Sequence, residues 1–274
     1  IVPEINDSYV PDADIIMSTW WQMAYAINTL SNKKGKKINL IQDYEIWNGD
    51  QDKVHDSYRL PINHLVIAKY LEEIFESQTG EKPQMMPSPF DNNNYFITCP
   101  IKDREPHNIM MLYSEEERKG TKYGLQALFE LKKKFPELVV TLFGVYPNPD
   151  LPSWMQYHRK PSNLPELYNK NAIFLSPSLG EGWALPPVEA MSCGCALVCT
   201  DIGGHSYAIN NFTALLTEVK AIDAMVEKIS LLILNKKQRI ILAENGNQFI
   251  NSNFSIDTAV SRLETYFYNL VGKQ

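Results

Sequence analysis

The sequence has no apolar run long enough to cross a bilayer, no excess of basic residues and no pattern of paired cysteines. A membrane-spanning helix needs roughly 18–20 consecutive apolar residues, and no stretch of the 274 residues approaches that length. The formal net charge is −6, which disfavours a broad nucleic-acid surface but permits one focused anion site. These absences favour a globular protein, and the length predicts two domains.

The four cysteines are Cys99, Cys193, Cys195 and Cys199. Three of them fall in a stretch that reads as a helix end, a turn and a buried strand, with no second cysteine or histidine cluster nearby. Core packing therefore explains them better than a disulfide framework or a metal site. We expect no metal and a cytoplasmic location.

Short apolar runs alternate with segments of helical periodicity, which is typical of βα units stacked into a parallel sheet. The first part of the chain, to residue 96, predicts strands at 14–19 and 38–41 and helices at 20–30 and 64–77. A fuller series follows, with expected strands at 109–113, 138–144, 172–177 and 196–200, helices at 121–135, 164–170 and 187–192, and three terminal helices.

One lysine-rich segment, residues 31–37 (SNKKGKK), has the composition that binds anionic lipid headgroups. It would place the protein peripherally at the inner face of the membrane, where a membrane-bound substrate would lie. A solvated turn between a helix and a strand is the simpler interpretation, and both alternatives stay open at this point.

The most informative stretch is residues 176–204, SPSLGEGWALPPVEAMSCGCALVCTDIGG. It begins at the carboxyl end of an expected strand and passes through Gly180 and Gly182 into a helix opened by Pro186 and Pro187. Ligands bind at the carboxyl ends of strands in open α/β sheets, and free N–H groups at a helix start attract anions. This loop is therefore the candidate binding site.

Two carboxylates accompany that anion site, Glu181 before the expected helix and Glu189 within it. Beside a phosphate they would be repulsive unless they bound something else. The hydroxyl groups of a sugar and a ribose are suitable partners, because carboxylates are strong hydrogen-bond acceptors. Amides for phosphate and carboxylates for hydroxyls together indicate a nucleotide sugar.

The spacing of Glu181 and Glu189, in the setting P-S-x-x-E-G-x-x-L-P-x-x-E-A-x-x-x-G, resembles the donor motif of retaining GT-B glycosyltransferases of family 4. The resemblance extends over most of residues 108–272. Residues 42–45 (QDYE) and 86–91 are similar to members that transfer rhamnose and related sugars onto bacterial surface polysaccharides.

The resemblance implies two Rossmann-like, doubly wound α/β domains that face each other across a cleft. Residues 1–96 would form the acceptor-side domain and its linker, 97–256 the donor domain, and 257–274 a last helix that packs back on the first domain. The first domain looks incomplete, with about three expected strands. We therefore expect this chain to bind its donor but to transfer poorly without further N-terminal sequence.

The implied activity is transfer of a hexose or deoxyhexose from a nucleotide-diphosphate sugar to a glycan or lipid-linked acceptor, with retained anomeric configuration and no cofactor. Lys119 and Arg118 would act on the diphosphate, Glu181 on the donor hexose and Glu189 on the ribose. The implied amide ligands of the sugar and the diphosphate are those of Gly182, Trp183, Ala184 and Leu185.

Two positions depart from the family pattern. Ser114 stands where an arginine is usual, and Tyr207 stands where a glutamate is common. Arg118 would replace the missing charge, with a surface role as an equal alternative. His158 and Arg159 are candidates for the base in an expected loop over residues 157–160.

Trp183 would either stack on the donor or pack the loop, and His205 has no pattern that asks for a metal or a base. Two other functions remain open. One is a noncatalytic nucleotide-sugar-binding subunit, which the Ser114 departure makes conceivable. The other is a different enzyme on the same architecture, such as an epimerase or a phosphorylase.

Overall fold

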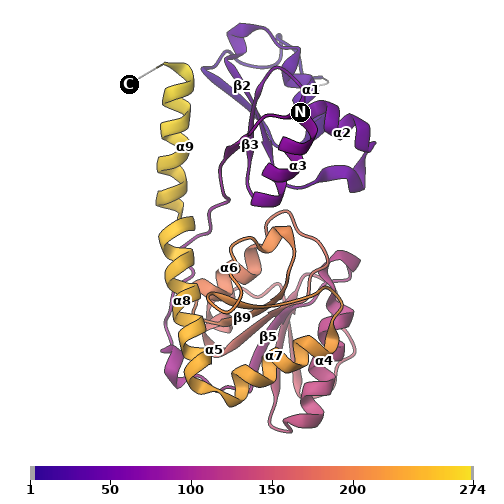
Figure 1. Ribbon diagram of the computed structural model, residues 1–274, viewed down its shortest axis with the longest axis vertical. Coiled ribbons are helices and arrows are strands. Elements are labelled where there is room, and N and C mark those ends of the chain that lie inside the picture. The colour runs from indigo at the N-terminus through magenta and orange to yellow at the C-terminus, as the bar shows by residue number, and fades with distance from the viewer. Residues whose placement is uncertain (1–3, 273–274) are drawn as a thin grey trace. The chain divides into compact units, whose positions relative to one another are not determined.

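A computed structural model describes residues 4–272 of the chain (Figure 1). These residues divide into two compact units. Unit 1 comprises residues 4–89 together with 257–272, and unit 2 comprises residues 90–256. Each unit is built on its own parallel β-sheet.

The sheet of unit 1 has four parallel strands in the order β1-β2-β3-β4. Three α-helices connect them, since parallel neighbours need crossover connections. The bounds of the strands and helices are β1 Ile15–Ser18, α1 Trp21–Asn28, β2 Lys36–Ile41, α2 Gln51–Tyr58, β3 Asn63–Val66, α3 Lys69–Thr79 and β4 Gln84–Met85.

The expected helix over residues 64–77 is wrong in its first third. Residues 63–66 form β3, and α3 begins only at Lys69, after Ala68 in an extended conformation. Leu65 and Val66 are fully buried between neighbouring strands, which favours a strand for this short apolar run. Helix α2 was also missed, because its sequence QDKVHDSY has few apolar residues to mark a period.

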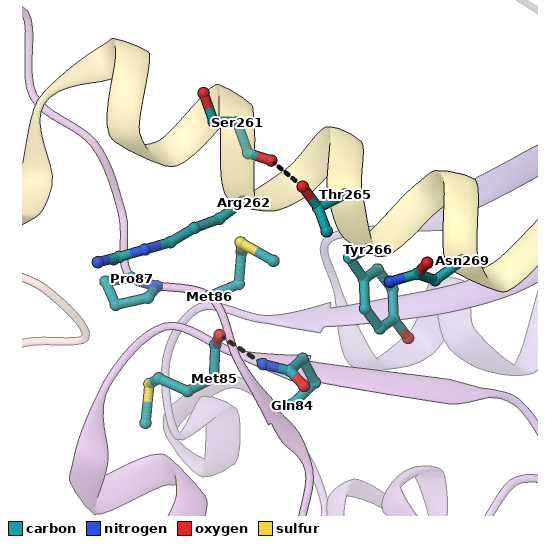
Figure 2. Close-up of a pocket in the computed structure, with 9 residues that line it drawn as sticks. All are labelled: Gln84, Met85, Met86, Pro87, Ser261, Arg262, Thr265, Tyr266 and Asn269. Atoms are coloured by element: carbon teal, nitrogen blue, oxygen red, sulfur yellow. Dashed lines mark hydrogen bonds between the residues drawn. The ribbon is translucent and has the colours of Figure 1, made fainter. Parts of the chain in front are cut away.

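The last helix, α9 (Ile256–Val271), covers one face of this sheet. Its half-buried side chains Leu263, Tyr266, Phe267 and Leu270 pack against a core formed by Ile38, Leu65 and Met86. Val260, which has the same apolar character, is 46% exposed. A groove of about 590 Å³ lies between α9 and residues 84–87 (Figure 2).

The sheet of unit 2 has six parallel strands in the order β10-β9-β8-β5-β6-β7. Its strands are β5 Asn108–Leu112, β6 Val139–Gly144, β7 Met155–Arg159, β8 Ile173–Ser176, β9 Ala196–Thr200 and β10 Ala214–Thr217. Its helices are α4 Thr121–Lys134, α5 Leu164–Lys170, α6 Leu185–Ser192, α7 Ile222–Leu234 and α8 Lys236–Phe254.

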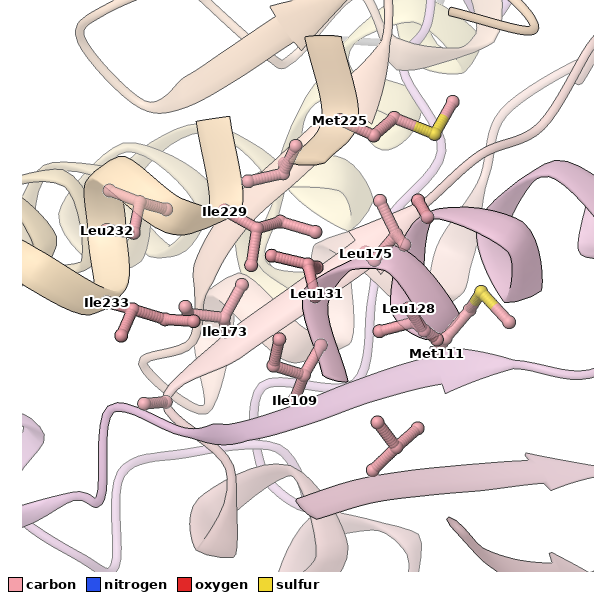
Figure 3. Close-up of a cluster of buried hydrophobic side chains, with 14 of the residues drawn as sticks. Ile109, Met111, Leu128, Leu131, Ile173, Leu175, Met225, Ile229, Leu232 and Ile233 are labelled. Carbon is pink, nitrogen blue, oxygen red and sulfur yellow. The ribbon is translucent and has the colours of Figure 1, made fainter. Parts of the chain in front are cut away.

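Both faces of this sheet are buried, as a parallel sheet with helices on each side requires. Alternate strand residues point to opposite faces: Ile109 and Met111 contribute to one core and Met110 to the other. Figure 3 shows the first of these cores, in which the strands meet side chains of α4 and α7 such as Leu128 and Ile229. The second core includes side chains of α5, α6 and α8.

Two strands of unit 2 were not predicted. The segment expected as a loop at 157–160 lies largely in the edge strand β7, and β10 pairs with β9 at the opposite edge. The cysteine prediction is confirmed: Cys193, Cys195 and Cys199 are free thiols buried in the core. Within residues 4–272, no helix is both long and apolar enough to cross a bilayer.

Candidate functional site

The candidate site lies where the strand order of unit 2 reverses. The chain runs outward from β5 through β6 to β7, returns to β8 on the other side of β5, and continues through β9 to β10. The crevice outside the carboxyl ends of two such strands is where open α/β sheets bind ligands. The loops after β5 and β8, residues 113–120 and 177–184, therefore meet at this reversal point.

Glycine allows these loops to pack closely. Gly120 has a φ of +63°, and a Cβ atom there would lie 2.0 Å from the carbonyl oxygen of Pro177. A Cβ atom on Gly204, in the loop after β9, would lie 2.4 Å from Cβ of Glu181. The N–H of Leu179 also donates to the carbonyl of Arg118 at 2.7 Å. The loops that follow the adjacent strands β5, β8 and β9 are therefore packed closely against one another.

Lys119 and Glu181 meet inside this structure. Lys119 Nζ lies 2.9 and 2.8 Å from the two carboxylate oxygens of Glu181, and the side chains are only 17% and 7% exposed. The hydroxyl of Ser178 donates to the same carboxylate at 2.9 Å. The structure therefore brings together two of the predicted site residues as a largely buried ion pair, which the sequence pattern did not indicate.

A buried histidine connects the ends of β8 and β9. His205 is 2% exposed, with Nδ1 2.8 Å from the carbonyl of Thr200 and Nε2 3.1 Å from the hydroxyl of Ser176. A carbonyl can only accept, so Nδ1 carries the proton and Nε2 accepts from Ser176. Burial lowers the pKa of His205. Thr200 in turn donates to the backbone carbonyl of Ser178, whose side chain holds Glu181.

Glu189 lies on α6. Its Oε2 accepts a hydrogen bond of 2.9 Å from the hydroxyl of Tyr168, a fully buried residue of α5. Burial raises the pKa of Glu189, and hydrogen bonds from Tyr168 and Tyr95 partly counteract that rise. The carboxylate is thus held in position by groups from the core rather than by solvent.

The expected cradle of backbone amides is smaller than the sequence implied. The N–H of Ala184 already donates to the carbonyl of Gly204 at 3.1 Å, so Ala184 does not offer that amide to an anion in this conformation. The amides that remain as predicted ligands of the sugar and the diphosphate are those of Gly182, Trp183 and Leu185. Helix α6 begins at Leu185, with Pro186 and Pro187 in its first turn.

The sequence matches a known protein family. The family model described as glycosyl transferases group 1 matches residues 101–249, more than half of the chain. The chain belongs to this glycosyltransferase family.

Two relatives are similar over shorter segments. An N,N'-diacetylbacillosaminyl-diphospho-undecaprenol alpha-1,3-N-acetylgalactosaminyltransferase of Campylobacter jejuni is 39% identical over 88 residues, which are 32% of this chain and 23% of that protein. The lipopolysaccharide core biosynthesis mannosyltransferase LpsB of Rhizobium meliloti is 26% identical over 113 residues, 40% of this chain and 32% of its own length. The matched segment spans less than a third of either relative.

A solved structure shows the same fold. Anabaena HepE in complex with UDP aligns with a TM-score of 0.82 and 14% identity, covering 94% of this chain and 79% of that one. At this identity the likeness concerns the fold alone, which is that of GT-B glycosyltransferases with Rossmann-like α/β domains.

In this group 1 glycosyltransferase, Tyr207 is part of the second core of unit 2. It is fully buried, and its hydroxyl donates to the carbonyl of Ala184 at 2.7 Å. The ring of Trp183 packs edge-on against Tyr207 at 5.0 Å and against Phe254 at 5.1 Å. Of the two alternatives for Trp183, the structure thus shows packing of the loop, and Tyr207 fixes that loop.

Ser114 and Arg118 shape the turn after β5. Ser114 is 8% exposed, and its hydroxyl accepts from the N–H of Glu116 at 3.2 Å while its own N–H donates to Thr121 Oγ1. Arg118 is an exposed residue whose Nε lies 3.1 Å from a carboxylate oxygen of Glu116. Ser114 therefore holds the turn, and the Arg118 guanidinium engages Glu116.

His158 and Arg159 lie near the carboxyl end of β7, where Phe143 pairs with His158. Strand β6 separates them from β5, so they do not join the Lys119–Glu181 pair. Arg159 Nε donates to the carbonyl of Val145 at 3.2 Å. The contacts of Ser178 and Tyr168 were not predicted, although both residues lie in segments, SPS and LPELY, that follow the family pattern.

Proposed function

We propose that this chain supplies the donor site of a retaining hexosyltransferase of family 4 type, which uses a nucleotide-diphosphate sugar. The observation that carries the proposal is the pairing of Lys119 with Glu181 at the strand-order reversal of unit 2. A cation for a diphosphate and an acceptor for sugar hydroxyls stand side by side there. The glycosyltransferase family membership supports the same reaction class.

In the proposed complex, the diphosphate replaces Glu181 as the partner of Lys119. Glu181 then accepts hydrogen bonds from the donor hexose, and Ser178 keeps its carboxylate oriented. Glu189, held by Tyr168, accepts from the ribose. The amides of Gly182, Trp183 and Leu185 complete the diphosphate site at the start of α6.

Transfer breaks the bond between the anomeric carbon and the diphosphate oxygen, and that oxygen leaves with the nucleoside diphosphate. Negative charge grows on the leaving group, so a fixed cation such as Lys119 stabilises the transition state more than the ground state. The acceptor hydroxyl attacks from the same face and gives its proton to the departing phosphate. The configuration of the anomeric carbon is thereby retained.

The remaining candidates have secondary roles in this proposal. Arg118 adds positive potential near the diphosphate but is engaged by Glu116, and Ser114 maintains the turn that carries Lys119. His158 and Arg159 would contact the base only from the edge strand β7. Lys119 provides the charge that a divalent ion supplies in other transferases, so we propose a metal-independent reaction. Activity abolished by a chelator and restored by Mn²⁺ or Mg²⁺ would contradict that.

The names of two relatives support a proposal for the acceptor and the location. The Campylobacter protein is named for a diphospho-undecaprenol acceptor and the Rhizobium protein for lipopolysaccharide core biosynthesis. We therefore propose a glycan or lipid-linked saccharide as acceptor, in bacterial surface polysaccharide synthesis on the cytoplasmic side of the membrane.

The test begins with donor binding. Isothermal titration of the chain with UDP-, GDP- and dTDP-sugars measures whether one nucleotide sugar binds more tightly than the matching free nucleotide. Incubation of the full-length protein with that donor and a lipid-linked saccharide follows, and NMR of the product assigns its anomeric configuration. An inverted product would contradict retention, and absence of binding to every nucleotide sugar would contradict the donor site.

A noncatalytic nucleotide-sugar-binding subunit is the second candidate, favoured by the buried Ser114 in the position of a usual arginine. The same experiment distinguishes it from the enzyme, because it predicts donor binding without turnover in the full-length protein. An epimerase would instead convert the donor when no acceptor is present.

A further inference from the structure

Two tryptophans lie in the segments that follow neighbouring strands of unit 1. Trp20 follows β1, and Trp47 lies in the short 3-10 helix η2 (Glu45–Asn48) after β2. Their ring centroids are 5.7 Å apart at an interplanar angle of 77°, and Trp47 is 63% exposed. Tryptophan side chains combine a large apolar surface with a polar N–H group and are enriched at interfaces and in ligand sites, so an exposed tryptophan that contacts a second one is a candidate binding surface.

The loops that carry this pair are fastened to each other. Glu45, only 7% exposed, accepts a hydrogen bond of 2.9 Å from the backbone N–H of Trp21 at the start of α1. A Cβ atom on Gly49 would lie 2.7 Å from the buried ring of Trp21. The loops after β1 and β2 thus form one packed unit, and the pair of tryptophans is in place before any ligand binds.

The chemistry beside the pair suits a sugar. A pyranose ring has one face of C–H groups, which packs on an aromatic ring, and a rim of hydroxyl groups, which need hydrogen-bond partners. The indole N–H of Trp20 donates to the side-chain oxygen of Gln22 at 3.2 Å. That contact holds the exposed amide of Gln22 next to the rings, where its NH2 group can serve a hydroxyl.

We propose that Trp20 and Trp47 form a stacking site for a pyranose ring of the saccharide acceptor. This inference rests on the proposed function: the donor residues belong to unit 2, so a transferase needs a second ligand site. The carboxyl ends of the parallel strands in unit 1 are the edge at which such a sheet binds ligands.

Charge argues against a lipid surface as the occupant. Asp43 and Asp50 flank η2, and carboxylates repel the anionic headgroups that attract basic segments. The lysine-rich segment 31–37 leads into the amino end of β2, at the opposite edge of the sheet. Within it, Lys34 is buried in an ion pair with Asp12 at 2.7 Å.

The experiment compares Trp47→Ala with Trp47→Phe, which retains an aromatic face. Saturation-transfer NMR and tryptophan fluorescence measure binding of methyl glycosides of glucose, galactose, mannose, rhamnose and N-acetylgalactosamine to the full chain. Tyr268→Ala is the matched control, since Tyr268 is an exposed aromatic residue (54%) of unit 1 on α9. Binding of UDP-, GDP- and dTDP-sugars is titrated for every variant.

We expect at least one glycoside to bind, Trp47→Ala to weaken it roughly tenfold, and Trp47→Phe and Tyr268→Ala to stay within about threefold of the original chain. Donor binding should be the same in all four proteins, so a failure of the donor titrations would count against the proposed function alone. Equal glycoside binding by Trp47→Ala, or no glycoside binding by the original chain, would overturn the stacking site. Quenching of Trp47 by brominated phosphatidylglycerol vesicles in place of glycosides would also overturn it.

Discussion

Removing the charge of Lys119 tests the candidate site most directly. In Lys119→Met the carboxylate of Glu181, 7% exposed, would keep Ser178 as a hydrogen-bond donor but lose the cationic partner that lies 2.8 Å away. Removing one partner of a fully buried ion pair costs about 3–5 kcal/mol, because the other charge is left buried and unpaired. The cost is smaller here because the lysine is 17% exposed. We therefore expect a loss of about 2–3 kcal/mol, or roughly 5–10 °C in Tm, in the ligand-free chain.

The same substitution acts separately on the reaction. If Lys119 faces the leaving diphosphate, its loss removes about 3–4 kcal/mol of transition-state stabilisation, which is two to three orders of magnitude in kcat. Combining Lys119→Met with Glu181→Gln should restore part of the Tm, because no buried charge is then stranded, but none of the rate. The second substitution would thus separate the effect on stability from the effect on catalysis.

Differential scanning calorimetry and transfer assays on the full-length protein measure both effects. Lys122→Met is the matched control: this lysine lies three residues away, is 61% exposed and pairs with Glu117 at 3.6 Å. An exposed pair contributes less than about 1 kcal/mol, so the control should change little. A rate for Lys119→Met within a small factor of the original would refute the placement of Lys119 at the diphosphate.

Three further outcomes follow from the structure. Gly120→Ala should lower the free energy of unfolding by at least about 2 kcal/mol, because φ is +63° and Pro177 blocks a Cβ; Gly180→Ala, with open space around it, should be neutral in chemical denaturation. Burial raises the pKa of Glu189, so the folded state loses stability as pH rises from the ordinary glutamate pKa through the raised one. Glu189→Gln should therefore gain Tm relative to the original chain as pH rises above the ordinary glutamate pKa of about 4.3, while ribose binding weakens; a Tm difference that does not change with pH would contradict this. Tyr207→Phe leaves the carbonyl of Ala184 without its 2.7 Å donor and should cost about 1–2 kcal/mol; an unchanged Tm and donor KM would show that Tyr207 does not fix the loop.

Local sequence patterns were sufficient to predict a helix or strand where the apolar residues follow one regular pattern. The run at 196–200 is buried along its whole length and forms the interior strand β9, and the periodicity from Thr121 onward marks α4. The pattern failed at residues 63–66, where a four-residue buried strand runs into the helical period of α3. It also failed at 155–159, because an edge strand with one solvated face has the polar composition of a loop.

The sequence alone was enough to predict a binding loop in residues 176–204. The glycines, prolines and carboxylates that form this strand end and the following helix start are close together in the chain. Their order was enough to predict a nucleotide-sugar site around Glu181 and Glu189. The partners of those carboxylates were decided only by the tertiary structure. Lys119 is 62 positions from Glu181, and the two meet because β5 and β8 become neighbours where the strand order reverses. The contact of Trp20 with Trp47 likewise depends on the pairing of β1 with β2. Hydrophobic burial of the sheets brings such side chains together, and no local period in the sequence records it.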